Sequence, residues 1–186
     1  MIKGKQVLLR LVEERDLPLL VRWRNNPEDR RLFFSPFLIS EGGQKQWYER
    51  LLADQARMLF MIDTLEGEAV GTIGLDGIDW RNQEAELGQF YIDPEVRGRD
   101  YPLEATVLII EYAFDELNLH RLYGVFYDFN RGPMAMAEFF GFRREAVLRQ
   151  AAFAGGKFHD KVILGLLREE WRAELGVRED ERTSFL

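Results

Sequence analysis

The sequence contains no cysteine and only two histidines, His120 and His159. The lack of cysteine excludes disulfide bonds, thiolate nucleophiles and cysteine-ligated metals. Two histidines are few for a metal site or a catalytic triad. One precedes an expected strand and the other lies in an expected hairpin, so packing or surface roles are favoured over catalysis. We therefore expect no metal, and catalysis must use other groups.

Positive charge and long apolar runs are also scarce. The 25 basic and 32 acidic side chains give a net charge of −7, which argues against broad nucleic-acid binding. Trp23, Trp47 and Trp80 are accordingly interpreted as packing residues rather than a base-stacking platform. No segment is apolar for long enough to span a membrane, and the first residues lack the features of a secretory signal. We expect a cytoplasmic protein, and its oligomeric state stays open.

The chain is long enough for one core, since 46% of its 186 residues are apolar. We expect a single domain over 1–176 and a charged tail over 177–186. Hydrophobic periodicity predicts a mixed α/β (α+β) fold in which strands and helices share one core. The expected strands are 6–11, 58–63, 69–79, 85–93 and 120–130, followed by a hairpin over 142–167 that turns at Gly155 and Gly156. The expected helices follow the first strand and cover 41–55, 103–117 and 133–140.

An aromatic loop follows the first helix. The segment RRLFFSPFLIS contains Phe33, Phe34 and Phe37, and Pro36 prevents it from forming a regular helix. These three side chains are candidates for substrate binding. The alternative is a loop that covers the core.

Three segments carry a resemblance to a known family: IGLDGIDWRNQEAELGQFYIDPEVRGR, YAFDELNLHRLYGVFYDFN and EFFGFRREAVLRQAAFAGGKFHDKVILGLLREEW. In this order and spacing they resemble GNAT acetyltransferases, in particular those that acetylate ribosomal-protein N-termini or spermidine. The resemblance implies a twisted mixed sheet with flanking helices, whose fourth and fifth strands splay apart. The pantetheine arm of acetyl-CoA would pair with the fourth strand, AELGQFYID. The implied acceptor is an amine of a small molecule or of a protein N-terminus.

Glu86 is the candidate general base, because attack of an amine on a thioester requires removal of a proton. A salt-bridged strand carboxylate is the alternative role for this residue. Backbone N–H groups near Phe90, Tyr91 or Ile92 would stabilise the oxyanion and hold the donor. Strict alternation along the strand would place five residues on one face: Glu84, Glu86, Gly88, Phe90 and Ile92.

The expected pyrophosphate loop departs from the family pattern. Arg97 and Gly98 match it and Arg99 adds positive charge, so all three are donor-binding candidates. Asp100 and Pro102 stand where small residues are typical. Asp100 would repel a diphosphate and Pro102 has no N–H to donate. The alternative is that Asp100 caps the following helix and the loop has no phosphate-binding role.

The donor site has a second departure. Asn130 matches the residue that ends the fifth strand, where its side chain would orient the donor or cap a turn. Many relatives have a tyrosine that protonates the departing thiolate, and here Ala137 occupies that position. The leading prediction is thus an acetyl-CoA-dependent N-acetyltransferase. The alternatives are an acyltransferase that takes its acyl group from a carrier protein or aminoacyl-tRNA, and an inactive GNAT-fold module with a binding or regulatory role.

Overall fold

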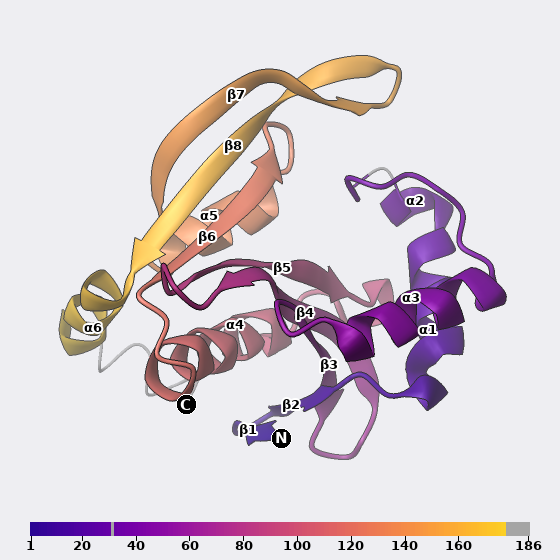
Figure 1. The fold of residues 1–186 in the computed structure, drawn as a ribbon, viewed down its shortest axis with the longest axis horizontal. Coiled ribbons are helices and arrows are strands. Elements are labelled where there is room, and N and C mark those ends of the chain that lie inside the picture. The colour runs from indigo at the N-terminus through magenta and orange to yellow at the C-terminus, as the bar shows by residue number, and fades with distance from the viewer. Residues whose placement is uncertain (31, 178–186) are drawn as a thin grey trace.

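The computed structural model describes residues 1–30 and 32–177. Their strands form one eight-stranded sheet in the order β1-β2-β3-β4-β5-β6-β8-β7 (Figure 1). All pairs are antiparallel except β5 and β6, which are parallel. The strands are β1 (Ile2–Lys3), β2 (Val7–Leu11), β3 (Met58–Thr64), β4 (Ala69–Asp79), β5 (Glu84–Ile92), β6 (Arg121–Tyr127), β7 (Arg143–Ala154) and β8 (Lys157–Leu167).

The helices are close to those that the periodicity predicts. A capping hydrogen bond from the N–H of Gly43 to Ser40 Oγ begins α3, and Pro102 lies in the first turn of α4. The pattern did not predict α6, which reaches Val177; the rest of the expected tail lies outside the described residues. The helical segments are η1 (Glu14–Asp16), α1 (Leu17–Asn25), α2 (Pro27–Arg30), α3 (Glu41–Ala53), η2 (Pro94–Val96), α4 (Tyr101–Glu111), η3 (Tyr112–Glu116), α5 (Arg131–Phe139) and α6 (Arg168–Val177).

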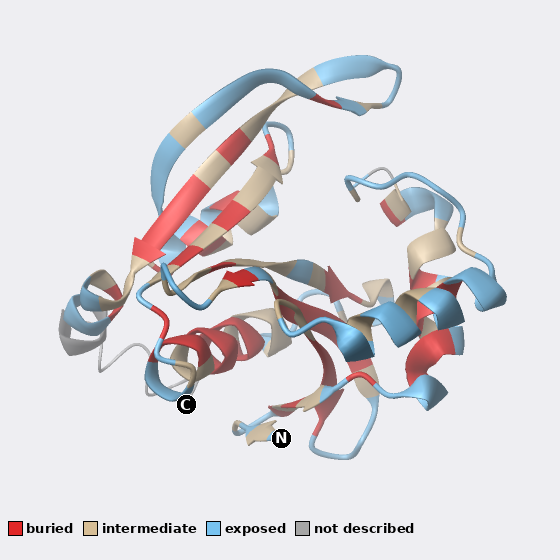
Figure 2. Ribbon diagram, in the orientation of Figure 1, coloured by how far each residue is buried: buried red, intermediate tan, exposed pale blue. Residues whose placement is uncertain are grey.

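Helices cover both faces of the sheet, as the continuous burial of β3 from Leu59 to Thr64 requires. Phe60 and Ile62 face the larger core with α4, α5 and α6, whereas Leu59 and Met61 face a smaller core with α1 and α3. Helix α4 is buried around most of its surface (Figure 2). These two layers confirm the expected mixed fold. None of the helices in the described ranges is long and apolar enough to cross a membrane.

The last two strands form the predicted hairpin. Gly155 and Gly156 both have positive φ angles, +57° and +82°, which a two-residue turn of this type needs and glycine adopts without strain. Much of the hairpin beyond its base is exposed (Figure 2). Near the turn, the side chain of His159 packs on Phe129 and its Nδ1 lies 3.1 Å from Asp128 Oδ1, which agrees with the expected packing or surface role. Trp80, by contrast, is 49% exposed and does not pack in either core.

Candidate active site

The central strands separate soon after they meet. β5 and β6 pair in parallel through only three residue pairs, the last of them Glu86 with Tyr123. Beyond this point, no described strand pairs with the β6 side of β5, so some of the backbone N–H and C=O groups along 87–92 face the gap. This is the splayed slot that the resemblance implies.

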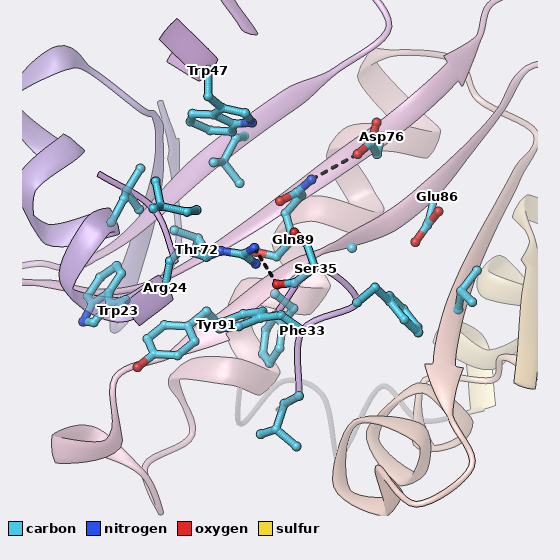
Figure 3. Close-up of a pocket in the computed structure, with 18 of the residues that line it drawn as sticks. Trp23, Arg24, Phe33, Ser35, Trp47, Thr72, Asp76, Glu86, Gln89 and Tyr91 are labelled. Carbon is cyan, nitrogen blue, oxygen red and sulfur yellow. Dashed lines mark hydrogen bonds between the residues drawn. The ribbon is translucent and has the colours of Figure 1, made fainter. Parts of the chain in front are cut away.

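A cavity of about 710 Å³ opens at this slot, which is a suitable size for a small-molecule site. Its walls come from α1, the aromatic loop and α3 on one side and from β4, β5 and β6 on the other. Figure 3 shows Glu86, Asp76 and Gln89 at one part of the wall and Arg24, Phe33 and Tyr91 at another. We call this space the central cavity.

A β-bulge changes which β5 side chains face the central cavity. The register with β4 shifts between Gly88 and Tyr91, and Gln89 has a φ of +53°. Thr72 donates a 2.7 Å hydrogen bond from Oγ1 to the carbonyl of Gln89 and so holds the bulge in place.

The expectation that Glu84, Glu86, Gly88, Phe90 and Ile92 share one face is therefore wrong for its last two members. Phe90 and Ile92 pack against the larger core, while Tyr91 joins the smaller core beside Trp23. The extra residue of the bulge reverses the alternation from this point on. Phe90 and Tyr91 still line the central cavity, and Ile92 does not.

Glu86 lies where the strands separate and lines the central cavity. Its carboxylate oxygen is the nearest atom that a Cβ added to Gly88 would meet, at 3.4 Å, which confirms that the two residues share a face. Burial raises the pKa of Glu86, and the nearby negative charge of Asp76 raises it further, whereas Lys161 lowers it. No described residue forms an ion pair with Glu86, so the salt-bridge alternative has no support in the structure.

Asp76 is the second carboxylate at this end, directly opposite Glu86 in the β4–β5 register. It accepts hydrogen bonds from Arg57 Nε at 2.9 Å and from Gln89 Nε2 at 3.0 Å. Asp76 is therefore held in an ion pair with Arg57, whereas Glu86 has no ion-pair partner among the described residues and is the candidate proton acceptor.

The aromatic loop contributes two of its three predicted side chains to the central cavity. Phe33 stacks on Tyr91 with ring centroids 5.9 Å apart, and Phe34 packs on Tyr127 at 4.5 Å. Both line the cavity, whereas Phe37 is 75% exposed and does not. Phe33 and Phe34 thus both cover the core and line the cavity.

Asp29 joins the aromatic region to the donor loop. This residue is 3% exposed, and its carboxylate accepts hydrogen bonds from Tyr91 Oη at 3.0 Å and from Arg97 Nη2 at 2.6 Å. Burial and the Asp29 carboxylate both raise the pKa of Tyr91. Arg97, a predicted donor-binding residue, is thus anchored to α2 and lies outside the cavity lining.

The donor loop begins α4 without the expected side-chain cap. Asp100 occupies the N-cap position, but its side chain makes no capping hydrogen bond, so the capping alternative is wrong. The N–H groups of Gly98, Asp100 and Tyr101 have no acceptor among the described residues. The loop therefore retains free donors for an anion although Pro102 contributes none. Arg99 packs its guanidinium 5.7 Å from the ring of Tyr101.

Asn130 lines the central cavity at the start of α5, where its side chain makes no capping hydrogen bond. The capping alternative is wrong for this residue too. Ala137 is a buried residue of α5 and offers no proton donor. Two tyrosines line the central cavity, and the hydroxyls of both already donate hydrogen bonds within the protein. Tyr91 donates to Asp29, and Tyr127 donates to the carbonyl of Phe33 at 3.3 Å.

Sequence reasoning missed Arg24 and Asp29. Arg24 follows Leu20 by one helical turn and therefore lies on the apolar side of α1. A charged residue in this position could have been identified from the sequence as a candidate site residue. Asp29 gave no such signal, because its contacts with Tyr91 and Arg97 span more than sixty residues of sequence.

The site combines two parallel strands that splay apart, an unpaired strand edge and a partly buried carboxylate at the junction. This arrangement is that of an acyltransferase site. Residues 6–143 match the acetyltransferase (GNAT) domain family. The chain belongs to this family of acetyltransferases, which confirms the fold and the enzyme class that the sequence predicts.

Its relatives include members of both groups that the sequence resembles. It is 26% identical to the spermidine N(1)-acetyltransferase of Escherichia coli K12, covering 94% of this chain and 92% of the relative. It is 27% identical to YdaF of Bacillus subtilis, a candidate ribosomal N-acetyltransferase, covering 92% and 96%. The crystal structure of Vibrio cholerae spermidine N-acetyltransferase with CoA and spermine superposes with a TM-score of 0.83 at 25% identity, covering 90% of this chain and 98% of that one.

Proposed function

We propose that this protein transfers the acetyl group of acetyl-CoA to a primary amine of a small molecule or protein N-terminus, with Glu86 as general base. The observation that carries the proposal is the position of Glu86, a partly buried carboxylate where β5 and β6 separate that has no ion-pair partner in the described part of the chain. A carboxylate with a raised pKa is a better proton acceptor than an ordinary surface carboxylate.

The donor supplies an acyl thioester, and the chain supplies the groups around it. The unpaired edge of β5 at 87–92 presents backbone groups to the pantetheine arm, and one of its N–H groups donates to the thioester oxygen as negative charge develops there. Asn130 borders the same slot. The N–H groups of Gly98, Asp100 and Tyr101 and the guanidinium of Arg99 would hold the diphosphate, and Arg97 keeps the loop in place through Asp29. The CoA thiolate leaves without a tyrosine to protonate it, because Ala137 occupies the position where many relatives have that tyrosine.

Neither alternative prediction gains support. An acyl-carrier or aminoacyl-tRNA donor would need a basic docking surface, whereas the chain has a net charge of −7. An inactive module would have no use for a desolvated carboxylate at the strand junction, and the family and its named relatives are acetyltransferases.

The direct test measures acetyl transfer to a panel of amines. Purified protein is incubated with acetyl-CoA and with aminosugars, amino acids, spermidine or short peptides with free N-termini. We expect release of CoA together with an acetylated product detected by mass spectrometry. Calorimetric titration with acetyl-CoA runs in parallel. Absence of both acetyl-CoA binding and product would overturn the proposal in favour of an inactive module.

Replacing Asp100 with Asn should tighten binding of acetyl-CoA. The substitution removes one negative charge beside the donor diphosphate, and we expect Kd to fall about fivefold at low salt, equivalent to ~1 kcal/mol. The gain should shrink at high salt, because the repulsion is screened. Titration calorimetry at two salt concentrations measures it. The matched control is Glu66→Gln, which removes one charge from the distant β3–β4 turn. Unchanged Kd at low salt would show that this loop does not meet the diphosphate.

A further inference from the structure

Arg24 occupies a position where helix packing predicts an apolar residue. The residues that anchor α1 in the smaller core are Leu17, Leu20 and Trp23, and Arg24 lies one turn beyond Leu20. Its side chain lines the central cavity, and Figure 3 shows the guanidinium directed toward Ser35 beside Thr72. A charged group has thus been placed in the cavity wall rather than on the outer surface of α1.

This guanidinium has no carboxylate partner among the described residues. Arg24 Nη2 donates one hydrogen bond, to the carbonyl of Ser35 at 3.3 Å, and its Cζ lies 4.2 Å from the ring centroid of Phe33. The other N–H donors of the five on the group have no described acceptor. Partial burial lowers the pKa of Arg24, yet a guanidinium stays charged at physiological pH. The wall therefore holds a partly desolvated positive charge without a counter-ion.

Charges of both signs line the central cavity. Arg50 lies near the end of α3, from which the chain continues to Arg57 and β3, so it lies toward the end that holds the carboxylates. Arg57 forms an ion pair with Asp76 at 2.9 Å there, whereas Glu86 has no ion-pair partner among the described residues. Arg24 lies beside the aromatic loop, with Trp23, Phe33 and Trp47 as apolar wall of the same cavity. Glu86 thus suits an amine and Arg24 an anion.

We propose that Arg24 binds an anionic group that the acceptor carries in addition to its amine. The proposal rests on the proposed function and narrows its substrate class to amines with a carboxylate or a phosphate. The planar guanidinium fork matches both groups through paired N–H donors. A polyamine is a poor fit, because its further ammonium groups would approach an uncompensated guanidinium in a partly desolvated wall.

The test compares probes that share one primary amine and differ only at the far end of an alkyl spacer. The four ends are an alcohol, a carboxylate, a phosphate and a second amine, each at several spacer lengths. Binding is followed by the intrinsic fluorescence of Trp23 and Trp47, which line the central cavity, so no acetyl transfer is needed. We expect the carboxylate or the phosphate probe to bind at least about tenfold more tightly than the alcohol, and the diamine most weakly. The better of the two anionic probes identifies the acceptor chemistry.

Arg24→Gln should reduce the tenfold preference to near unity, and Arg24→Lys should retain part of it, since it keeps the charge but loses the fork. The matched control is Arg22→Gln, which alters an exposed arginine of the same helix outside the cavity lining and should keep the preference. Circular dichroism confirms that each variant is folded. Equal binding of all four probes, no binding of any, or tightest binding of the diamine would overturn the proposal. So would an Arg24→Gln variant that keeps the preference or loses affinity only for acetyl-CoA.

The same probes separate this proposal from the proposed function. Acetyl transfer to the alcohol and diamine probes as readily as to the anionic ones would leave the N-acetyltransferase intact and remove the anion site. Tight binding of an anionic probe without any acetyl transfer would keep the anion site and remove the transferase.

Discussion

Glu86→Gln is expected to lower kcat for acetyl transfer by about two orders of magnitude while leaving the protein folded. The amide cannot accept a proton from the acceptor amine, directly or through water, and it keeps the size of the carboxylate. Steady-state release of CoA at saturating acetyl-CoA measures the effect. Glu84→Gln is the matched control, because Glu84 lies two residues earlier on β5, pairs with Arg121 at 3.2 Å and does not line the central cavity. Similar loss in both variants, or in neither, would remove Glu86 from the mechanism.

The pH dependence provides an independent readout. The base acts in its deprotonated form, and burial raises the pKa of Glu86, so the acid limb of kcat/KM should lie at higher pH than for an ordinary carboxylate. This limb should be absent from the residual activity of Glu86→Gln.

The same shift has a consequence for stability. A raised folded-state pKa means that the folded state binds this proton more tightly than the unfolded state. The resulting stabilisation is present at low pH and is lost as pH rises through the pKa of Glu86 in the folded state. At neutral pH the carboxylate is therefore unfavourable for folding, and Glu86→Gln should melt no lower than the unaltered protein.

Glu104→Gln is expected to lower the free energy of unfolding by about 3 kcal/mol. Glu104 lies on α4 with no exposed surface, and its carboxylate accepts hydrogen bonds from the backbone N–H groups of Lys5, Gln6 and Val7. Glutamine turns one acceptor oxygen into an NH₂ donor that faces other donors, and buried donors without acceptors are costly. For a protein of this size the melting temperature should fall by roughly 6–12 °C.

Chemical denaturation with a matched control tests this role. Glu138→Gln removes a charge from an exposed position on α5 and should change stability by less than about 0.5 kcal/mol. Equal stability of the two variants would show that the Glu104 carboxylate does not hold the turn between β1 and β2. Because Glu104 lies outside the central cavity lining, its loss should act through stability rather than through the acceptor site.

Local sequence patterns predicted much of this protein for physical reasons. Alternation in 58–63 and helical spacing in 103–117 reflect burial of one face or stripe, which is a property of neighbouring residues. Gly155 and Gly156 marked the last hairpin because their turn needs positive φ angles. Glu86 became a candidate because the resemblance identified its strand as the donor-binding one and alternation along that strand set the face of its side chain.

Features that depend on contacts between distant segments were not predictable in this way. The bulge at Gln89 depends on Thr72 and on the register of β4, so Phe90 and Ile92 were assigned to the wrong face. Asp100 and Asn130 are residue types that often cap helices, yet neither caps the helix that follows it. The burial of Asp29 and its bonds to Tyr91 and Arg97 likewise follow only from the packing of α2 against the loop after β5.

The sequence by itself determined most strands and helices, the final hairpin and the absence of thiol chemistry, because each follows from local periodicity or residue content. The acetyltransferase resemblance came from three segments in their order and spacing. The tertiary structure decided which groups share the central cavity. Among the described residues it gave Glu86 no ion-pair partner, paired Asp76 with Arg57 and exposed Arg24 to the cavity. Charge compensation and desolvation depend on what surrounds a side chain in three dimensions, and no local pattern encodes them.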